Sequence, residues 1–102
     1  MFYTYLLRCK DNSLYCGYTG NVERRMKEHK IGSGSKYVKA KGYMKLEFYL
    51  SVKSRSEAMK FESYIKSLPK KEKEKLVSGD SFVLKKLGIS YTICMCKDLN
   101  EY

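Results

Sequence analysis

The sequence contains no tryptophan, one proline and one histidine among its 102 residues. It also lacks an uninterrupted apolar run of about 18 residues, which a membrane-spanning helix would need. The first residues, MFYTYLLRCK, contain neither a basic leader segment nor a small-residue cleavage site, so we expect no signal peptide. With 43% hydrophobic residues the chain can bury one modest core, and we expect one compact domain that does not enter a membrane.

Cysteine is present but lacks the spacing of a zinc site. The four cysteines are at positions 9, 16, 94 and 96, so only one closely spaced pair exists. Cys9 and Cys16 fall in apolar, strand-like runs, where a free thiol behaves as a small hydrophobic residue. We therefore expect reduced thiols in an intracellular protein.

Acidic residues are outnumbered by basic ones, 11 to 21, which gives a formal net charge of +10. Such a surplus in one small domain favours a polyanionic partner, because bound cations release counterions from nucleic acid. Lysines that only aid solubility are the alternative explanation. Lysine is far more frequent than arginine, and this suits general attraction to phosphate better than bidentate recognition of bases.

The apolar pattern predicts a small α+β domain with strands and helices in the order β-β-α-β-α-α. We expect a three-stranded, at least partly antiparallel sheet flanked by helices, followed by a C-terminal tail with a short helix and a short strand. Residues 32–45 have no clear period and are expected to form a flexible basic loop and an irregular segment. The predicted strands are 2–8, 13–19 and 46–52, and the predicted helices are 22–30, 54–68 and 70–77.

The loop between the first two predicted strands fixes which side chains share a face of the sheet. A three-residue loop, 10–12, pairs Tyr5 with Gly17 and Leu7 with Tyr15. A two-residue loop would place the rings of Tyr5 and Tyr15 on opposite faces, because side chains alternate along a strand. In the first register Gly17 leaves space beside the Tyr5 ring.

Two of the predicted helices carry ionisable residues on their apolar faces. Arg25 and His29 continue the apolar stripe of helix 22–30, and Glu62 lies on the apolar stripe of helix 54–68. A carboxylate that faces a core is costly unless a cation, a metal ion or water meets it. This pattern has two interpretations, a site formed between the helices or an internal Arg25–Glu62 ion pair at the margin of the core.

Several ordered motifs carry a family resemblance. They are Tyr3-Thr4-Tyr5, LYCGYT at 14–19, ERRMKEH at 23–29, GSGSKY at 32–37 and SRSEAMKFESYIK at 54–66. Together they resemble the GIY-YIG nuclease superfamily, and most closely a small single-domain branch similar to the catalytic domain of Slx-type structure-selective endonucleases. The likeness covers residues 2–77, although Tyr3 and Cys16 replace the first glycine and the second isoleucine of the family name.

The resemblance implies a metal-dependent endonuclease that hydrolyses DNA, with a branched or flapped duplex as substrate and a role in repair or recombination. It implies that Glu62 holds a single divalent ion, Mg²⁺ or Mn²⁺. Arg25 would stabilise charge in the transition state, and Tyr5 would be the general base, with a phenol pKa lowered by nearby positive charge. Tyr15 and His29 would position the phosphate or relay protons. The residues expected to touch the nucleic-acid backbone are Arg24, Lys36, Tyr37, Lys39 and Lys41.

The resemblance also sets the expected domain organisation and an alternative function. Residues 1–77 would form the nuclease domain, and residues 78–102 a C-terminal extension packed on the same domain. The alternative is a basic nucleic-acid-binding module with weak or partner-dependent nuclease activity. It arises because relatives of this type work with a scaffold subunit that brings a zinc-binding domain. We expect no appended segment that recognises sequence, and therefore no strict sequence specificity.

Overall fold

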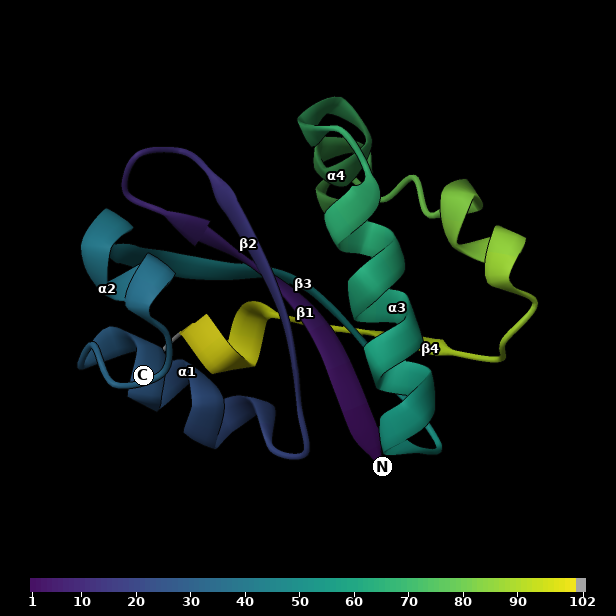
Figure 1. Ribbon diagram of the computed structural model, residues 1–102, viewed down its shortest axis with the longest axis horizontal. Helices are drawn as coiled ribbons and strands as arrows, with labels where there is room; N and C mark the ends of the chain where they lie inside the picture. Colours follow the sequence, from purple (N-terminus) through teal and green to yellow (C-terminus); the bar gives the residue numbers. More distant parts are fainter. Residues whose placement is uncertain (101–102) are drawn as a thin grey trace.

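The computed structural model describes residues 1–100 and shows a four-stranded antiparallel sheet with helices on both of its faces (Figure 1). The strand order is β2-β1-β3-β4, so β1 and β3 are the central strands. The predicted α+β class is confirmed. In chain order the elements are β1 (Phe2–Cys9), β2 (Leu14–Thr19), α1 (Val22–Lys30), α2 (Lys36–Lys41), β3 (Tyr43–Val52), α3 (Arg55–Ser67), α4 (Lys70–Val77), the 3₁₀ helix η1 (Phe82–Leu87), β4 (Thr92–Cys94) and the 3₁₀ helix η2 (Lys97–Asn100).

The sheet has four strands, whereas the sequence predicted three. The fourth is β4, which pairs antiparallel with β3 from Tyr49–Cys94 to Ser51–Thr92. A strand of three residues has too little pattern of its own to reveal that it joins a partner more than 40 positions earlier. The predicted boundary at residue 77 stays a prediction, and the last two residues of the predicted extension lie outside the described residues.

The segment expected to be irregular contains α2 and the first residues of β3. Ser35 caps α2, because its hydroxyl accepts a hydrogen bond from the backbone N–H of Val38. Gly42 ends α2 with a φ of 86°, a conformation that glycine adopts without strain. β3 therefore begins at Tyr43, three residues before the predicted start.

The β1–β2 hairpin has the register that follows from a three-residue loop. Tyr5 pairs with Gly17 and Leu7 pairs with Tyr15, so the first of the two registers considered from the sequence is the one formed. Asn12 has a φ of 73°, which a three-residue hairpin loop needs at its last position and which asparagine tolerates. The rings of Tyr5 and Tyr15 consequently lie on the same face of the sheet, with their centroids 6.4 Å apart.

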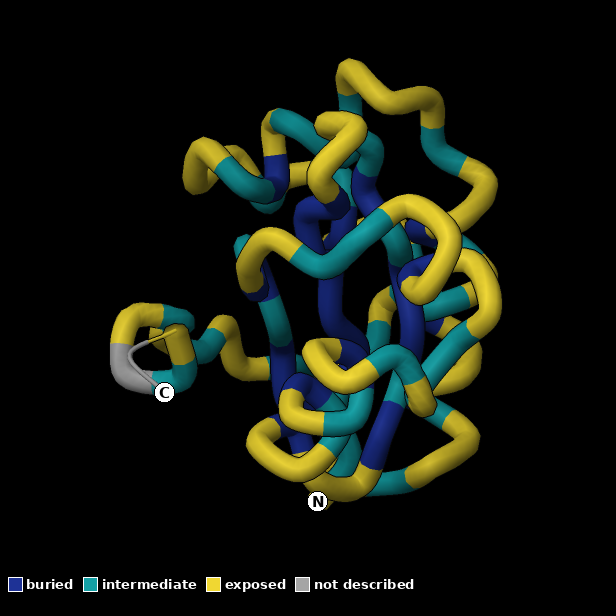
Figure 2. Tube along the Cα trace, turned by 90° about the vertical axis from the view of Figure 1, so that its left-hand side faces the viewer, coloured by how far each residue is buried: buried dark blue, intermediate teal, exposed yellow. Residues whose placement is uncertain are grey.

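Two apolar cores cover the two faces of the sheet. Side chains alternate along β1, so Leu6 points to one face and Tyr5 and Leu7 point to the other. Figure 2 shows the buried segments running through the middle of the molecule, beneath exposed loops and helices. The core on the α3 side comprises Leu6, Leu14, Cys16, Phe48, Leu50, Val52, Ala58, Phe61, Ile65, Leu76 and Leu84; the core on the α1 side comprises Tyr5, Leu7, Cys9, Val22, Met26, Val38 and Leu46.

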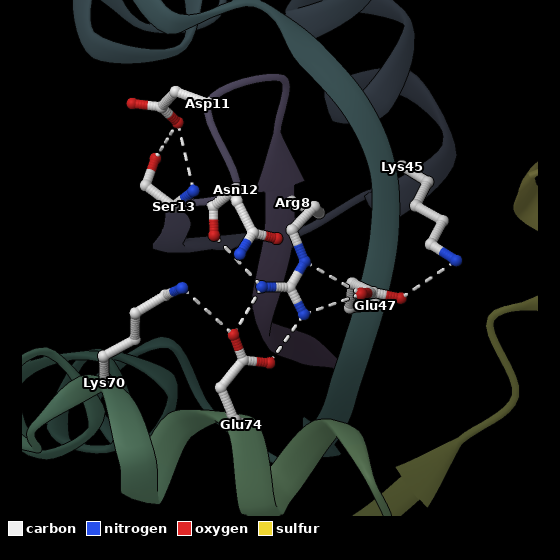
Figure 3. Close-up of polar contacts among 8 residues, drawn as sticks. All are labelled: Arg8, Asp11, Asn12, Ser13, Lys45, Glu47, Lys70 and Glu74. Atoms are coloured by element: carbon white, nitrogen blue, oxygen red, sulfur yellow. Dashed lines mark hydrogen bonds and ion pairs between the residues drawn. The ribbon is translucent and has the colours of Figure 1, made fainter.

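Arg8 is a buried cation that joins the sheet to α4 (Figure 3). Its Nη1 and Nη2 donate to the two carboxylate oxygens of Glu74 at 2.5 and 2.6 Å, and its Nε donates to Glu47 at 3.0 Å. Nη1 also donates to the backbone carbonyl of Asn12. These bonds from Arg8 lower the pKa of Glu74 to about 2. The fork of the guanidinium thus meets two carboxylates, which compensates for its removal from water.

Within residues 1–100, no helix combines the length and the apolar character needed to cross a membrane. All four cysteines are free thiols, as predicted. Cys9 and Cys16 are buried in the two cores, and burial raises the pKa of the Cys16 thiol to about 12. These buried thiols are packing residues at neutral pH.

Candidate active site

A cleft of about 330 Å³ lies beside β2, the edge strand that runs between α1 and α3 (Figure 1). Its lining residues come from the central strand β1, the edge strand β2, the helices α1 and α3, and the loops next to α1. Among them are four of the predicted catalytic residues, Tyr5, Tyr15, Arg25 and Glu62. The full lining is Phe2, Tyr5, Tyr15, Gly17, Tyr18, Thr19, Gly20, Arg24, Arg25, Gly34, Arg55 and Glu62.

Gly17 makes room for the ring of Tyr5. A Cβ atom at position 17 would lie 2.6 Å from the Cζ atom of Tyr5 and closer still to its hydroxyl oxygen. The space beside Gly17 is therefore filled by the outer end of the Tyr5 ring. This arrangement carries the Tyr5 hydroxyl across the neighbouring strand to the cleft.

The Tyr5 hydroxyl lies 2.8 Å from Nε2 of His29, the last buried residue of α1. The His29 ring is 2% exposed, and Gly34 packs directly against it, since a Cβ there would lie 2.7 Å from Nδ1. Nδ1 has no hydrogen-bond partner within residues 1–100. His29 thus approaches the cleft through Tyr5 and is covered on its other side by the loop before α2.

Burial determines the protonation of this pair. It lowers the pKa of His29 to about 4, assisted by the positive charge of Arg25. It raises the pKa of Tyr5 well above the usual value, and the opposing effect of Arg25 is smaller. The prediction that the Tyr5 pKa lies below its usual value is therefore wrong. Arg25 does favour the phenolate, but the cost of burying that charge is larger. Both side chains are uncharged at neutral pH.

Tyr15 occupies a stack of rings at one wall of the cleft. Its ring lies edge-on to the His29 ring at 5.6 Å, and it is stacked at an angle of 25° on the Tyr37 ring, with 5.7 Å between centroids. The ammonium of Lys66 lies 6.0 Å from the Tyr15 centroid. Tyr37 is 42% exposed, so the stack extends from the cleft to the surface of α2.

Arg25 and Glu62 line the same cleft but do not form the internal ion pair that was the alternative interpretation. Within residues 1–100, Arg25 pairs with Glu28 at 3.2 Å, and Glu62 pairs with Lys66 at 3.6 Å. The Arg25 side chain is 33% exposed and that of Glu62 is 20% exposed. Both charges therefore face the cleft and are partly exposed to solvent, where a phosphate or a cation can meet them.

The predicted backbone contacts divide into two groups. Arg24 lines the cleft, and Tyr37 reaches it through the ring stack on Tyr15. The lysines of α2 lie outside the cleft: Lys36 is exposed at its start, and Lys41 pairs with Asp11 at 3.6 Å. Lys39 lines a separate basic pocket, together with His29, Lys10, Lys30 and Lys45.

Arginine is concentrated in the cleft although it is scarce in the sequence. The arginines of the chain are Arg8, Arg24, Arg25 and Arg55, and all but Arg8 line the cleft. No lysine belongs to this lining among residues 1–100. Arg55 is not among the site residues predicted from the sequence. The feature that could have identified Arg55 is its position as the first residue of α3, where a positive side chain lies next to the positive end of the helix dipole.

Glu62 is the carboxylate that the cleft offers to a metal ion. No group of three or more His, Cys, Asp or Glu side chains that could enclose a metal occurs within residues 1–100. Mg²⁺ commonly binds through one or two carboxylates, keeps several waters, and uses substrate phosphate as a further ligand. A single, partly buried carboxylate beside an arginine-lined opening fits such a weakly held ion, and does not fit an enclosed structural metal.

The sequence model of the GIY-YIG catalytic domain matches residues 1–75, which include all the strands and helices that line the cleft. The chain belongs to the GIY-YIG family, a family of nuclease-type domains, as the motifs predicted. Its relatives include a UPF0213 protein of Clostridium perfringens, 43% identical over 81 residues that make up 79% of this chain and 87% of the relative. A UPF0213 protein of Cronobacter sakazakii is 46% identical over 79 residues, 78% of this chain and 83% of the relative.

A solved structure is also similar. The solution NMR structure of a UPF0213 protein from Bacillus halodurans has a TM-score of 0.50 and 39% sequence identity to this chain. The match covers 88% of this chain and all of the solved chain. The finer likeness to the Slx-type branch stays a prediction.

Proposed function

We propose that the protein is a divalent-metal-dependent endonuclease that hydrolyses phosphodiester bonds in DNA. The observation that carries the proposal is the convergence of Tyr5, Arg25 and Glu62 on one cleft, from a strand and two separate helices. We further propose that it acts on branched or flapped duplexes with weak sequence specificity, in DNA repair or recombination. The net charge of +10 supports a polyanionic substrate.

In this proposal Arg25 binds the scissile phosphate. Its guanidinium is partly buried and can offer two parallel N–H groups to phosphate oxygens. Glu28 holds it in place through the one-turn contact along α1. Charge that develops on the phosphoryl oxygens is then stabilised by a donor already in position, an effect commonly worth 10²- to 10³-fold in rate.

Tyr5 and His29 form the proposed proton path. Both groups are neutral before the reaction. In the His29 tautomer that carries its proton on Nδ1, the Tyr5 hydroxyl donates a hydrogen bond to Nε2, which is ready to accept a proton. Tyr5 can then accept a proton from an attacking water while its own proton moves to His29. A phosphate bound at Arg25 would offset the positive charge that lowers the His29 pKa, which makes His29 a better acceptor when substrate is present.

Glu62 is the proposed metal ligand, with Mg²⁺ or Mn²⁺ as the ion. When bound, such an ion polarises the phosphate and stabilises the leaving oxygen. Lys66 holds the Glu62 carboxylate at 3.6 Å, so it keeps this ligand at the mouth of the cleft. Tyr15 positions the Tyr5–His29 pair by packing against both rings.

The substrate backbone is proposed to continue from the cleft over α2. Arg24 and Tyr37 are the first contacts beyond the scissile phosphate, and the exposed lysines of α2 supply weaker attraction. These lysines of α2 are Lys36, Lys39 and Lys41. A scaffold subunit that delivers the DNA is part of the alternative proposal, in which the isolated chain binds DNA but cleaves it weakly.

The test is a nicking assay on a flapped and a linear duplex, with Mg²⁺, with Mn²⁺ and with EDTA. We expect metal-dependent nicking of the flapped duplex and its loss, by more than 100-fold, in Glu62→Gln. Glu23→Gln is the matched control, since Glu23 is an exposed residue of α1 outside the cleft. Activity in EDTA, or full activity of Glu62→Gln, would contradict the proposal. Tight binding without nicking would favour the partner-dependent alternative.

A further inference from the structure

Arg55 is the arginine of the cleft that the proposed chemistry does not use. It is the first residue of α3 and lines the cleft from that helix, whereas Arg24 and Arg25 line it from α1. The two helices lie on either side of β2 (Figure 1). Its side chain makes no ion pair within residues 1–100. The carboxylate closest to it along the chain, Glu57, is already engaged, because it accepts a hydrogen bond from the N–H of Ser54 in the capping box.

Tyr18 holds the Arg55 guanidinium in place. Nη2 of Arg55 donates to the Tyr18 hydroxyl at 3.2 Å, and the guanidinium carbon lies 5.7 Å from the centroid of the Tyr18 ring. Such a contact orients the planar group without neutralising its charge. The remaining N–H groups of Arg55 stay available to an anion in the cleft.

Arg55 opposes the electrostatics of its own helix. A cation in the first turn is unfavourable next to the positive end of the helix dipole, and α3 is otherwise well begun by the Ser54–Glu57 capping box. The position therefore gains nothing for helix stability from carrying arginine. A local preference that is violated at a cleft is a typical sign of a binding role.

The spacing along α3 separates Arg55 from the proposed chemistry. Arg55 precedes Glu62 by seven residues, which corresponds to about 10 Å along the helix axis. A DNA strand rises about 3.4 Å per nucleotide, so this distance spans about three nucleotides. Arg55 and Glu62 thus lie on one face of one helix, at a spacing suited to different phosphates of the same strand.

We propose that Arg55, oriented by Tyr18, binds a backbone phosphate that flanks the scissile one, so that α3 sets which phosphate lies beside Glu62. This proposal rests on the proposed function in its choice of a nucleic-acid strand as ligand. Arg24 and Arg25 on α1 and Arg55 on α3 then hold the strand from two sides. Tyr18 is a positioning residue, because it acts through Arg55.

Binding of a fluorescein-labelled flapped DNA, followed by anisotropy in EDTA over a series of NaCl concentrations, tests the proposal without any cleavage. For Arg55→Ala we expect roughly fivefold weaker binding and a salt dependence reduced by about one unit of slope, since one phosphate contact is lost. Arg55→Lys should retain the wild-type slope. Tyr18→Phe should weaken binding while leaving the slope unchanged, because it removes the orienting hydroxyl and no charge.

Lys60→Ala is the matched control, since Lys60 is an exposed cation on the same helix and lies outside the cleft. Its affinity should stay within about twofold of wild type. An Arg55→Ala protein that binds like Lys60→Ala, or a wild-type protein that does not bind the DNA, overturns the proposal. The circular dichroism of each variant reports its fold separately. If the Arg55 results hold and no nicking is found, the proposed nuclease function fails and this binding role stands.

Discussion

The hydroxyl oxygen of Tyr5 lies 2.8 Å from Nε2 of His29, and this contact connects the middle of β1 to the end of α1. Local structure alone does not bring these two residues together. The strand places Tyr5 opposite a glycine, and the helix turns His29 toward the sheet. The pair is buried and uncharged, so its chemistry depends on a proton shared between two neutral groups.

Removal of the Tyr5 hydroxyl should affect activity far more than stability. Tyr5→Phe keeps the ring over Gly17 and removes the group that passes a proton to His29, so we expect a fall in nicking rate of about 10²- to 10⁴-fold. Rates of single turnover on flapped DNA are the measurement. Tyr43→Phe is the control, because it removes a buried tyrosine hydroxyl that lies outside the cleft. Equal rates for the two variants would exclude a role for the Tyr5 hydroxyl.

A methyl group at Gly17 should displace the Tyr5 ring. Gly17→Ala places a carbon 2.6 Å from Cζ of Tyr5, so we expect a loss of about 1–3 kcal/mol in the free energy of unfolding, together with loss of nicking. Denaturant unfolding measures the first effect. In a Tyr5→Leu background the same change should cost much less, since the clashing ring end is absent. Gly20→Ala should be mild, because its Cβ would meet Phe2 only at 3.4 Å.

The stability of the protein should fall as the pH is lowered from 6.5 to 4. The His29 pKa is about 4 in the folded chain and near 6.5 in the unfolded chain. Between these values the unfolded chain binds more protons, so the stabilisation is complete above pH 6.5 and decreases toward pH 4. The shift corresponds to about 3 kcal/mol. Urea unfolding across this range should show a much shallower pH dependence in His29→Gln, and an unchanged dependence would contradict the assignment.

The Arg8–Glu74 pair should fasten α4 to the sheet. Glu74→Gln weakens a two-bond contact to a buried guanidinium, and we expect a loss of about 1–2 kcal/mol, moderated because the Glu74 side chain is 36% exposed. Thermal unfolding measures this loss. Glu72→Gln on the same helix is the control, since Glu72 has Lys75 as its ion-pair partner within residues 1–100 and makes no contact with Arg8 there. Similar melting temperatures for both variants would show that the Arg8 contact does not stabilise the fold.

Features with a local cause could be predicted from the sequence. The inward faces of α1 and α3 follow from apolar spacing, and the hairpin register follows from the length of one loop. That register was enough to place Tyr5 beside Gly17. The capping box at Ser54 predicted the start of α3 to within one residue.

Features that depend on distant partners could not be predicted in the same way. Arg8 sits in an apolar strand, and nothing near it in the sequence indicates that Glu74 meets it 66 positions later. The pKa of Tyr5 is raised by burial, a property of the packed cleft that residue types alone do not reveal. Arg55 lies between the two residues of the capping box, Ser54 and Glu57. That motif predicts a helix start and gives no indication that the arginine between them lines the cleft.

The edge of β3 that faces away from β1 is hydrogen-bonded by two different groups. β4 pairs with residues 49–51, and the side-chain amide of Asn100 both donates to the carbonyl and accepts from the N–H of Leu46. The amide thus imitates one residue of a neighbouring strand where β4 does not reach. An uncovered edge is a template for pairing with another chain. β4 and Asn100 thus occupy the edge of the longest strand that a second chain would otherwise be able to pair with, while the opposite edge of the sheet is left for the cleft.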